Sequence, residues 1–273
     1  MRVLVTGATG LLGGWLYERI AADNIEVLPG GSSTKQDLSD DIAVDALFSL
    51  VQPTIVIHCA AMSAIADCAK NPDRARAVNV EGTRNVATRA AAFGARLVHV
   101  STDLVFDGEA APYREDATPS PTSMYGKTKL EAETAAREAA DSVVVRVSLL
   151  YGPTKNERKG FFDATLAAFR DSKPITLFDD EWRTPLSLRA AADALWAIAR
   201  SDVHGLMHVG GPERMSRLEM GERLARQRSL PHPAMTHASR TSVPGEPRPR
   251  DVSLDRTLFD ARFPDIARAS FEE

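Results

Sequence analysis

A tyrosine and a lysine four residues apart, Tyr125 and Lys129, are the residues of this sequence best suited to acid–base chemistry. Positions four apart share one face of a helix, and a run with helical spacing opens at Tyr125. A tyrosine hydroxyl has a pKa near ~10, and a neighbouring ammonium group favours the phenolate and lowers that pKa. Such a pair can pass a proton to or from a carbinol oxygen while hydride moves at the carbon. We therefore predict that both residues are catalytic.

A hydroxyl-rich segment, Ser101-Thr102-Asp103, follows the apolar run 97–100. A hydroxyl at the carboxyl end of a parallel strand can hydrogen-bond a substrate carbonyl oxygen and polarise it. The alternative is that these side chains only cap the next turn. We predict that Thr102 completes a catalytic set with Tyr125 and Lys129.

Three glycines, Gly7, Gly10 and Gly13, lie between a short apolar run at 3–5 and a helical run at 11–22. This is the context of a dinucleotide-binding loop. The first glycine allows the tight turn, the second lets the backbone approach the pyrophosphate, and the third allows close helix packing. The helix N-terminus supplies N–H groups and the positive end of a dipole.

The stretch after the second predicted strand indicates which nucleotide is preferred. An Asp or Glu there would hold the ribose 2′-hydroxyl of NAD. This chain instead has Ser32, Ser33 and Lys35, which offer donors and a cation. The stretch favours NADP(H), with NAD(H) as the alternative.

The elements that must position these residues alternate between strand and helix. Short apolar runs predict strands at 3–5, 25–28 (stopped by the Pro-Gly-Gly at 29–31), 55–57, 97–100 and 143–145. Helical spacing appears at 11–22 and 42–51, and a long Ala-rich helix is predicted at 74–93. The pattern predicts an α/β fold with a Rossmann-type, doubly wound parallel sheet.

The pattern changes after residue 151. Helical runs remain at 161–170, 188–200 and 216–228, strands become sparser, and 240–250 is a Pro- and Arg-rich loop. We predict a cofactor-binding core with the catalytic helix over 1–151. Residues 152–273 are predicted to form mainly a smaller substrate-binding lobe, with strands that could return to the core.

Composition excludes several classes of protein. The chain has 273 residues, a formal net charge of −4 and two cysteines. The acidic balance argues against nucleic acid as a partner, and the cysteines exclude a disulfide scaffold. No metal site is expected, because His58, Cys59 and Cys68 are better explained by core packing. With no apolar run of ~18 residues and no signal peptide, we expect a cytoplasmic protein that does not associate with a membrane.

Taken together, these segments resemble the extended short-chain dehydrogenase/reductases, and most closely the dTDP-4-dehydrorhamnose reductases. The resemblance spans nearly the whole chain. It is carried by the segments 6–13, 101–108, 112–115, 125–131 and 248–255. It implies NAD(P)H-dependent reduction of a 4-keto sugar nucleotide, a small-molecule substrate, and a homodimer as one arrangement.

The resemblance also implies site residues. The catalytic set is Thr102, Tyr125 and Lys129, and Asp103, Phe106, Arg183 and Arg248 are predicted to contact substrate. The predicted cofactor-binding set is Gly7, Thr9, Gly10, Leu11, Leu12, Gly13, Ser32, Ser33, Lys35, Asp37, Leu38, Cys59, Ala60, Ala61, Met62, Asn79, Ser101, Tyr125 and Lys129.

Two other functions stay open. Met62 and Phe161 depart from the rhamnose-reductase pattern, which allows another keto sugar or a natural-product ketone as substrate of a reductase or epimerase. The segments 58–61 and 182–185 also resemble the regulatory β subunit of methionine adenosyltransferase, a cofactor-binding member of the same family.

Overall fold

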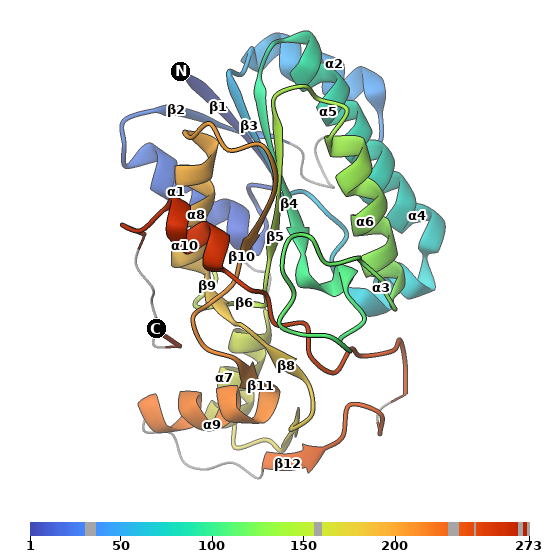
Figure 1. The fold of residues 1–273 in the computed structure, drawn as a ribbon, viewed down its shortest axis with the longest axis vertical. Helices are drawn as coiled ribbons and strands as arrows, with labels where there is room; N and C mark the ends of the chain where they lie inside the picture. Colours follow the sequence, from blue (N-terminus) through green and yellow to red (C-terminus); the bar gives the residue numbers. More distant parts are fainter. Residues whose placement is uncertain (31–36, 156–159, 229–234, 243, 267–269, 272–273) are drawn as a thin grey trace.

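The centre of the molecule is a parallel sheet in the strand order β10-β5-β4-β3-β1-β2 (Figure 1). The computed structural model describes residues 1–273 except 31–36, 156–159, 229–234, 243, 267–269 and 272–273. The sheet strands are β1 (Arg2–Thr6), β2 (Glu26–Gly30), β3 (Ile55–His58), β4 (Arg96–Thr102), β5 (Ser142–Val147) and β10 (Gly205–Val209). The predicted doubly wound sheet is confirmed.

Helices cover both faces of this sheet (Figure 1). Alternate strand residues divide between the faces: Val3 and Val5 pack with one helix layer, and Leu4 packs with the other. The first layer contains α1 (Leu11–Ala21), α8 (Leu188–Ala199) and α10 (Thr257–Arg262). The second contains α2 (Asp41–Val51), α5 (Gly82–Ala92) and α6 (Met124–Ala136).

Two predicted boundaries differ from the structure. β2 continues through Pro29 to Gly30, because it is an edge strand of the sheet and tolerates the missing N–H of proline there. The predicted helix at 74–93 begins earlier and is divided into α4 (Pro72–Arg76), a π-helical turn η1 (Ala77–Glu81) and α5. A π-turn of this kind is often found next to functional sites.

The C-terminal half contributes to both parts of the molecule. β10 pairs with β5, α8 packs on α1, and α10 packs on β10, so these elements belong to the core. A separate lobe is formed by α7 (Phe161–Arg170), β7 (Ile175–Phe178), β8 (Trp182–Arg183), β11 (Met215–Ser216), α9 (Arg217–Gln227) and β12 (Met235–Ala238). β6 (Leu150–Tyr151) and β9 (Leu186–Ser187) pair where the chain passes between the two parts. In the described part of the chain, no helix is long and apolar enough to cross a membrane.

Candidate active site

A cavity of about 920 Å³ lies where the carboxyl ends of the sheet strands face the lobe. Its walls come from the β1–α1 loop, the segments after β3 and β4, helix α6, and the loop 244–249. The carboxyl edge of a parallel sheet is where open α/β folds bind their ligands.

The β1–α1 loop forms a cradle that only glycine can build. Gly7 has a φ of +68°, and a Cβ on Gly13 would lie 2.2 Å from the carbonyl oxygen of Gly7. The first turn of α1 carries no acidic side chain, so the positive end of the helix dipole faces the cavity without competition. These features fit the pyrophosphate of a dinucleotide.

Most of the predicted cofactor-binding residues line this cavity. They are Gly7, Thr9, Gly10, Leu11, Leu12, Gly13, Asp37, Leu38, Cys59, Ala60, Ala61, Met62, Ser101, Tyr125 and Lys129. Ser32, Ser33 and Lys35 lie outside the described residues.

Asn79, in the π-turn η1, is not among the lining residues. Its buried amide donates to the carbonyl of Met62 and accepts from the Met62 N–H, and it also donates to the Thr128 hydroxyl. Asn79 therefore holds the cavity-lining segment after β3 against α6. This role differs from the predicted one, which was direct contact with a cofactor.

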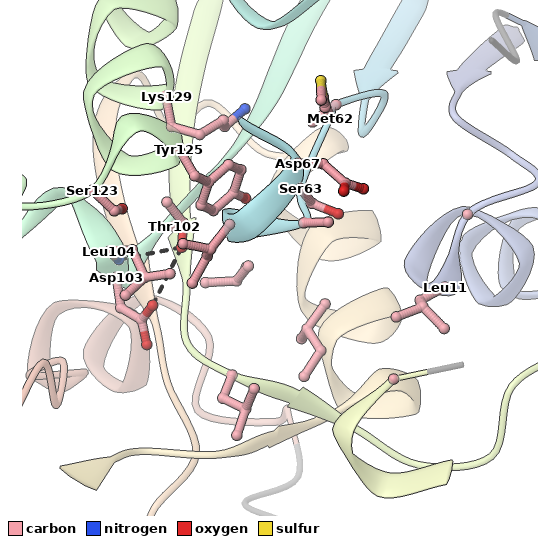
Figure 2. Close-up of a pocket in the computed structure, with 18 of the residues that line it drawn as sticks. Leu11, Met62, Ser63, Asp67, Thr102, Asp103, Leu104, Ser123, Tyr125 and Lys129 are labelled. Atoms are coloured by element: carbon pink, nitrogen blue, oxygen red, sulfur yellow. Dashed lines mark hydrogen bonds between the residues drawn. The ribbon is translucent and has the colours of Figure 1, made fainter. Parts of the chain in front are cut away.

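Tyr125 and Thr102 lie next to each other in the wall of the cavity (Figure 2). The Ser123 hydroxyl caps α6 by accepting from the Gly126 N–H at 3.1 Å. A Cβ on Gly126 would lie 2.2 Å from the carbonyl oxygen of Leu104, so this glycine allows α6 to approach the segment after β4. That approach places Tyr125 within hydrogen-bonding reach of Thr102.

The pKa of Tyr125 contradicts one expectation. Burial raises it well above its usual range, the charge of Asp103 raises it further, and only the hydrogen bond with Thr102 opposes them. The Lys129 ammonium does not lower it. The neutral phenol is therefore the resting form, which is the form that can donate a proton.

Lys129 reaches the cavity from the same face of α6 as Tyr125 (Figure 2). Its side chain is buried, and its Nζ lies 3.2 Å from Nε2 of His99 on β4. Burial lowers the pKa of Lys129 to about 8, with Glu133 acting in the opposite direction. The residue is thus poised to change its charge just above neutral pH.

α6 is fixed by a buried ion pair that the sequence analysis did not include. Glu133 lies one turn after Lys129 and contacts Arg146 of β5 at 2.8 Å through each carboxylate oxygen. It also accepts from the Ser101 hydroxyl at 2.6 Å. The only sequence signal was a charged residue, Arg146, inside an apolar strand.

Asp103 links Thr102 to the lobe. It accepts from the Ser148 hydroxyl at 2.9 Å and from Thr102 at 3.2 Å, and Nε of Arg183 lies 3.6 Å from its carboxylate. Burial raises the pKa of Asp103, and Arg183 opposes that rise. Asp103 and Arg183 both line the cavity, as do all but one of the predicted substrate residues.

Phe106 is the exception. It is fully buried, and its ring stacks on Tyr113 with the centroids 4.0 Å apart. It also lies outside the residues that line the cavity. The prediction that it contacts substrate is not supported, because its ring fills the small core beside the β4 segment.

The lobe side of the cavity carries a buried carboxylate surrounded by guanidinium groups. Glu181 contacts Arg217 at 2.8 Å, Arg248 at 3.3 Å and Arg183 at 3.4 Å. Burial opposes the charged form of Glu181, but the arginines outweigh it and keep the pKa of that carboxyl below its usual range. Arg217 and Glu181 were missed in the sequence because they lie in different elements. Among the described residues, the buried Nη1 of Arg217 has no hydrogen-bond partner.

Comparison with known proteins places these features in a family context. The model of the RmlD substrate binding domain matches residues 1–272. The β subunit of methionine adenosyltransferase 2 from Bos taurus is 33% identical over 93% of this chain and 80% of its own length. The dTDP-4-dehydrorhamnose reductase of Streptomyces griseus is 34% identical over 76% of this chain and 69% of its own.

Solved structures are similar over almost the whole chain. A dTDP-4-dehydrorhamnose reductase from Clostridium acetobutylicum has a TM-score of 0.90 at 28% identity, covering 99% of this chain and 96% of its own. The enzyme from Bacillus anthracis, solved in complex with NADP, has a TM-score of 0.91 at 25% identity, covering 99% and 95%.

Proposed function

Because this chain belongs to the RmlD substrate binding domain family and is an NAD(P)-dependent oxidoreductase, we propose that it reduces the keto group of a sugar nucleotide, with dTDP-4-dehydrorhamnose as the expected substrate. The observation that carries the proposal is the meeting of Thr102, Tyr125 and Lys129 in one cavity that begins at the glycine cradle. NADP(H) is the expected cofactor, with NAD(H) as the alternative. A homodimer and a cytoplasmic location stay predictions.

The catalytic residues divide the chemistry at the ketone. Bound NAD(P)H supplies the hydride. Tyr125 donates its phenolic proton to the carbonyl oxygen. The Thr102 hydroxyl polarises the same oxygen by turning toward it the proton that it donates to Asp103 in the resting protein. The ammonium donors of Lys129 would hold the ribose of the bound cofactor, and water restores the proton of Tyr125 before the next turnover.

The arginines on the lobe side give the substrate end of the cavity its charge. Arg183, Arg217 and Arg248 present planar, bidentate donors, which suit a pyrophosphate. We infer that the nucleotide part of the substrate binds there, so that its sugar reaches toward Thr102 and Tyr125. The unsatisfied donor of Arg217 supports this assignment.

The first test is to follow oxidation of NADPH, and separately of NADH, with dTDP-4-dehydro-L-rhamnose added. The variant to compare with the wild type is Tyr125→Phe. It should lower kcat by about 10²- to 10⁴-fold and leave the cofactor Kd nearly unchanged, because only the proton donor is lost. Wild-type turnover by this variant would refute the assignment. If NADPH binds but is not oxidised, a panel of other keto sugars and ketones tests the alternative substrates.

A second candidate function is favoured by similarity to the β subunits of methionine adenosyltransferase over 93% of this chain. In that case, the chain would be a cofactor-binding regulatory subunit. Co-purification with a methionine adenosyltransferase catalytic chain, and a change in that enzyme's kinetics on addition of this protein, would support it. Turnover of a keto sugar by the isolated protein would favour the reductase.

A further inference from the structure

A buried histidine on β4, His99, contacts the catalytic lysine. Its Nε2 lies 3.2 Å from Nζ of Lys129, and its side chain is fully buried. An ammonium group has only donors, so Nε2 must accept and the ring proton must lie on Nδ1. Among the described residues, Nδ1 has no hydrogen-bond partner, so Lys129 is the one polar group that is hydrogen-bonded to the His99 ring.

A second histidine, His58 on β3, lies beside His99. The two ring centroids are 5.3 Å apart. The Thr83 hydroxyl donates to the Asn79 carbonyl, so Nε2 of His58 donates to Thr83, and the Thr6 hydroxyl donates to Nδ1 at 2.6 Å. Both nitrogens of His58 are occupied, and it cannot compete for Lys129.

The other titratable groups facing this pair cannot replace His99 as the acceptor. Glu133 lies on α6, but its carboxylate is committed to Arg146 and Ser101. Burial raises the pKa of the Cys59 thiol to about 12, so it stays neutral. Arg137, which also faces His99, is a cation that disfavours protonation of the imidazole.

We propose that His99 is a positioning residue that acts through Lys129, accepting one ammonium proton and directing the other two toward the cavity. The proposal rests on the catalytic role proposed for Lys129. Burial and the neighbouring ammonium hold the pKa of His99 well below its usual range, so its acceptor is present throughout the physiological pH range. Loss of this acceptor removes a hydrogen bond from the charged form of Lys129, and the pKa of the lysine should then fall.

Two variants separate the hydrogen bond from packing. His99→Leu fills the site but has no acceptor, whereas His99→Gln places an amide oxygen near the position of Nε2. We expect His99→Leu to lower kcat/KM about tenfold at pH 8 and to move the alkaline limb of the pH profile to lower pH. His99→Gln should keep most of the wild-type kcat/KM at pH 8 and leave the alkaline limb near its wild-type position. His208→Leu, which removes an equally buried histidine of the same sheet, should leave the alkaline limb where it is.

A measurement independent of turnover is the imidazole ¹⁵N spectrum of the wild-type protein without cofactor. We expect His99 to carry its proton on Nδ1 from pH 6 to 8. A proton on Nε2, or a His99→Leu enzyme with an unmoved alkaline limb, would overturn the proposal. If the wild type reduces no ketone, the proposed function is wrong, and NADPH binding then tests His99. The positioning role still stands if His99 carries its proton on Nδ1 and if His99→Leu, but not His99→Gln, weakens NADPH binding. If the leucine variant does not fold, the wild-type spectrum still decides.

Discussion

Replacing Lys129 by methionine should change how the stability of the protein depends on pH. Lys129 is buried, and burial lowers its pKa from 10.5 to about 8. Methionine has a similar length and no charge. Below pH 8, Lys129 is charged in both the folded and the unfolded chain, so the folded protein carries the full cost of a buried ammonium group. As pH rises from 8 to 10.5, only the unfolded chain keeps the proton, and the cost disappears.

The magnitude follows from the two pKa values. A fall from 10.5 to about 8 corresponds to about 3 kcal/mol of folding free energy, at about 1.4 kcal/mol per tenfold change in affinity for the proton. Lys129→Met removes this cost but leaves Nε2 of His99 without a donor, which costs about 1–3 kcal/mol at every pH. The two effects are distinguished by pH, because only the first one titrates.

The assay is chemical denaturation of both proteins without cofactor at pH 7 and pH 10. Relative to wild type, the variant should lose about 2–3 kcal/mol of unfolding free energy between the two pH values. Lys127→Met, which changes an exposed lysine of the same helix, should show no such difference. An equal stability gap at both pH values would refute the reasoning, because Lys129 would then carry no buried charge at pH 7.

Three further predictions test the cradle and the two buried carboxylates. Gly13→Ala should weaken NADPH binding roughly 100-fold in a fluorescence titration, because its Cβ would push the Gly7 carbonyl out of place; unchanged affinity would contradict the cradle. Glu133→Gln should lower the unfolding free energy by about 3–5 kcal/mol at pH 7, because it leaves Arg146 buried without its counter-ion. Since the pKa of Glu133 is lowered on folding, this gap should shrink as pH falls below 4.5, and a constant gap would count against it. Glu181→Gln should bind dTDP more tightly in calorimetry, because three arginines lose a competing carboxylate; weaker binding would argue against an anion site.

The features that the sequence predicted are local ones. The glycine cradle depends on a few consecutive residues between β1 and α1. Tyr125 and Lys129 share a face because four residues make about one helical turn. In these cases spacing along the chain determines position in space, so the sequence is sufficient.

The features it missed depend on the packing of distant segments. His99 meets Lys129 only because α6 packs against β4. Glu133 meets Arg146 only because α6 also packs against β5. Burial, which no spacing reveals, also reversed the expected pKa change of Tyr125. A polar residue inside an apolar strand was the available signal, and it marks both His99 and Arg146.

The position of β10 beside β5 has a consequence for synthesis of the protein on the ribosome. β5 is buried along its whole length, but one of its neighbours, β10, is not translated until α7, β7 and β8 of the lobe have been made. A nascent chain that ends near residue 151 would therefore expose an apolar strand with unpaired backbone groups, which is a template for association with other chains. Chaperones that shield such edges should matter most for this protein while residues 152–204 are being made.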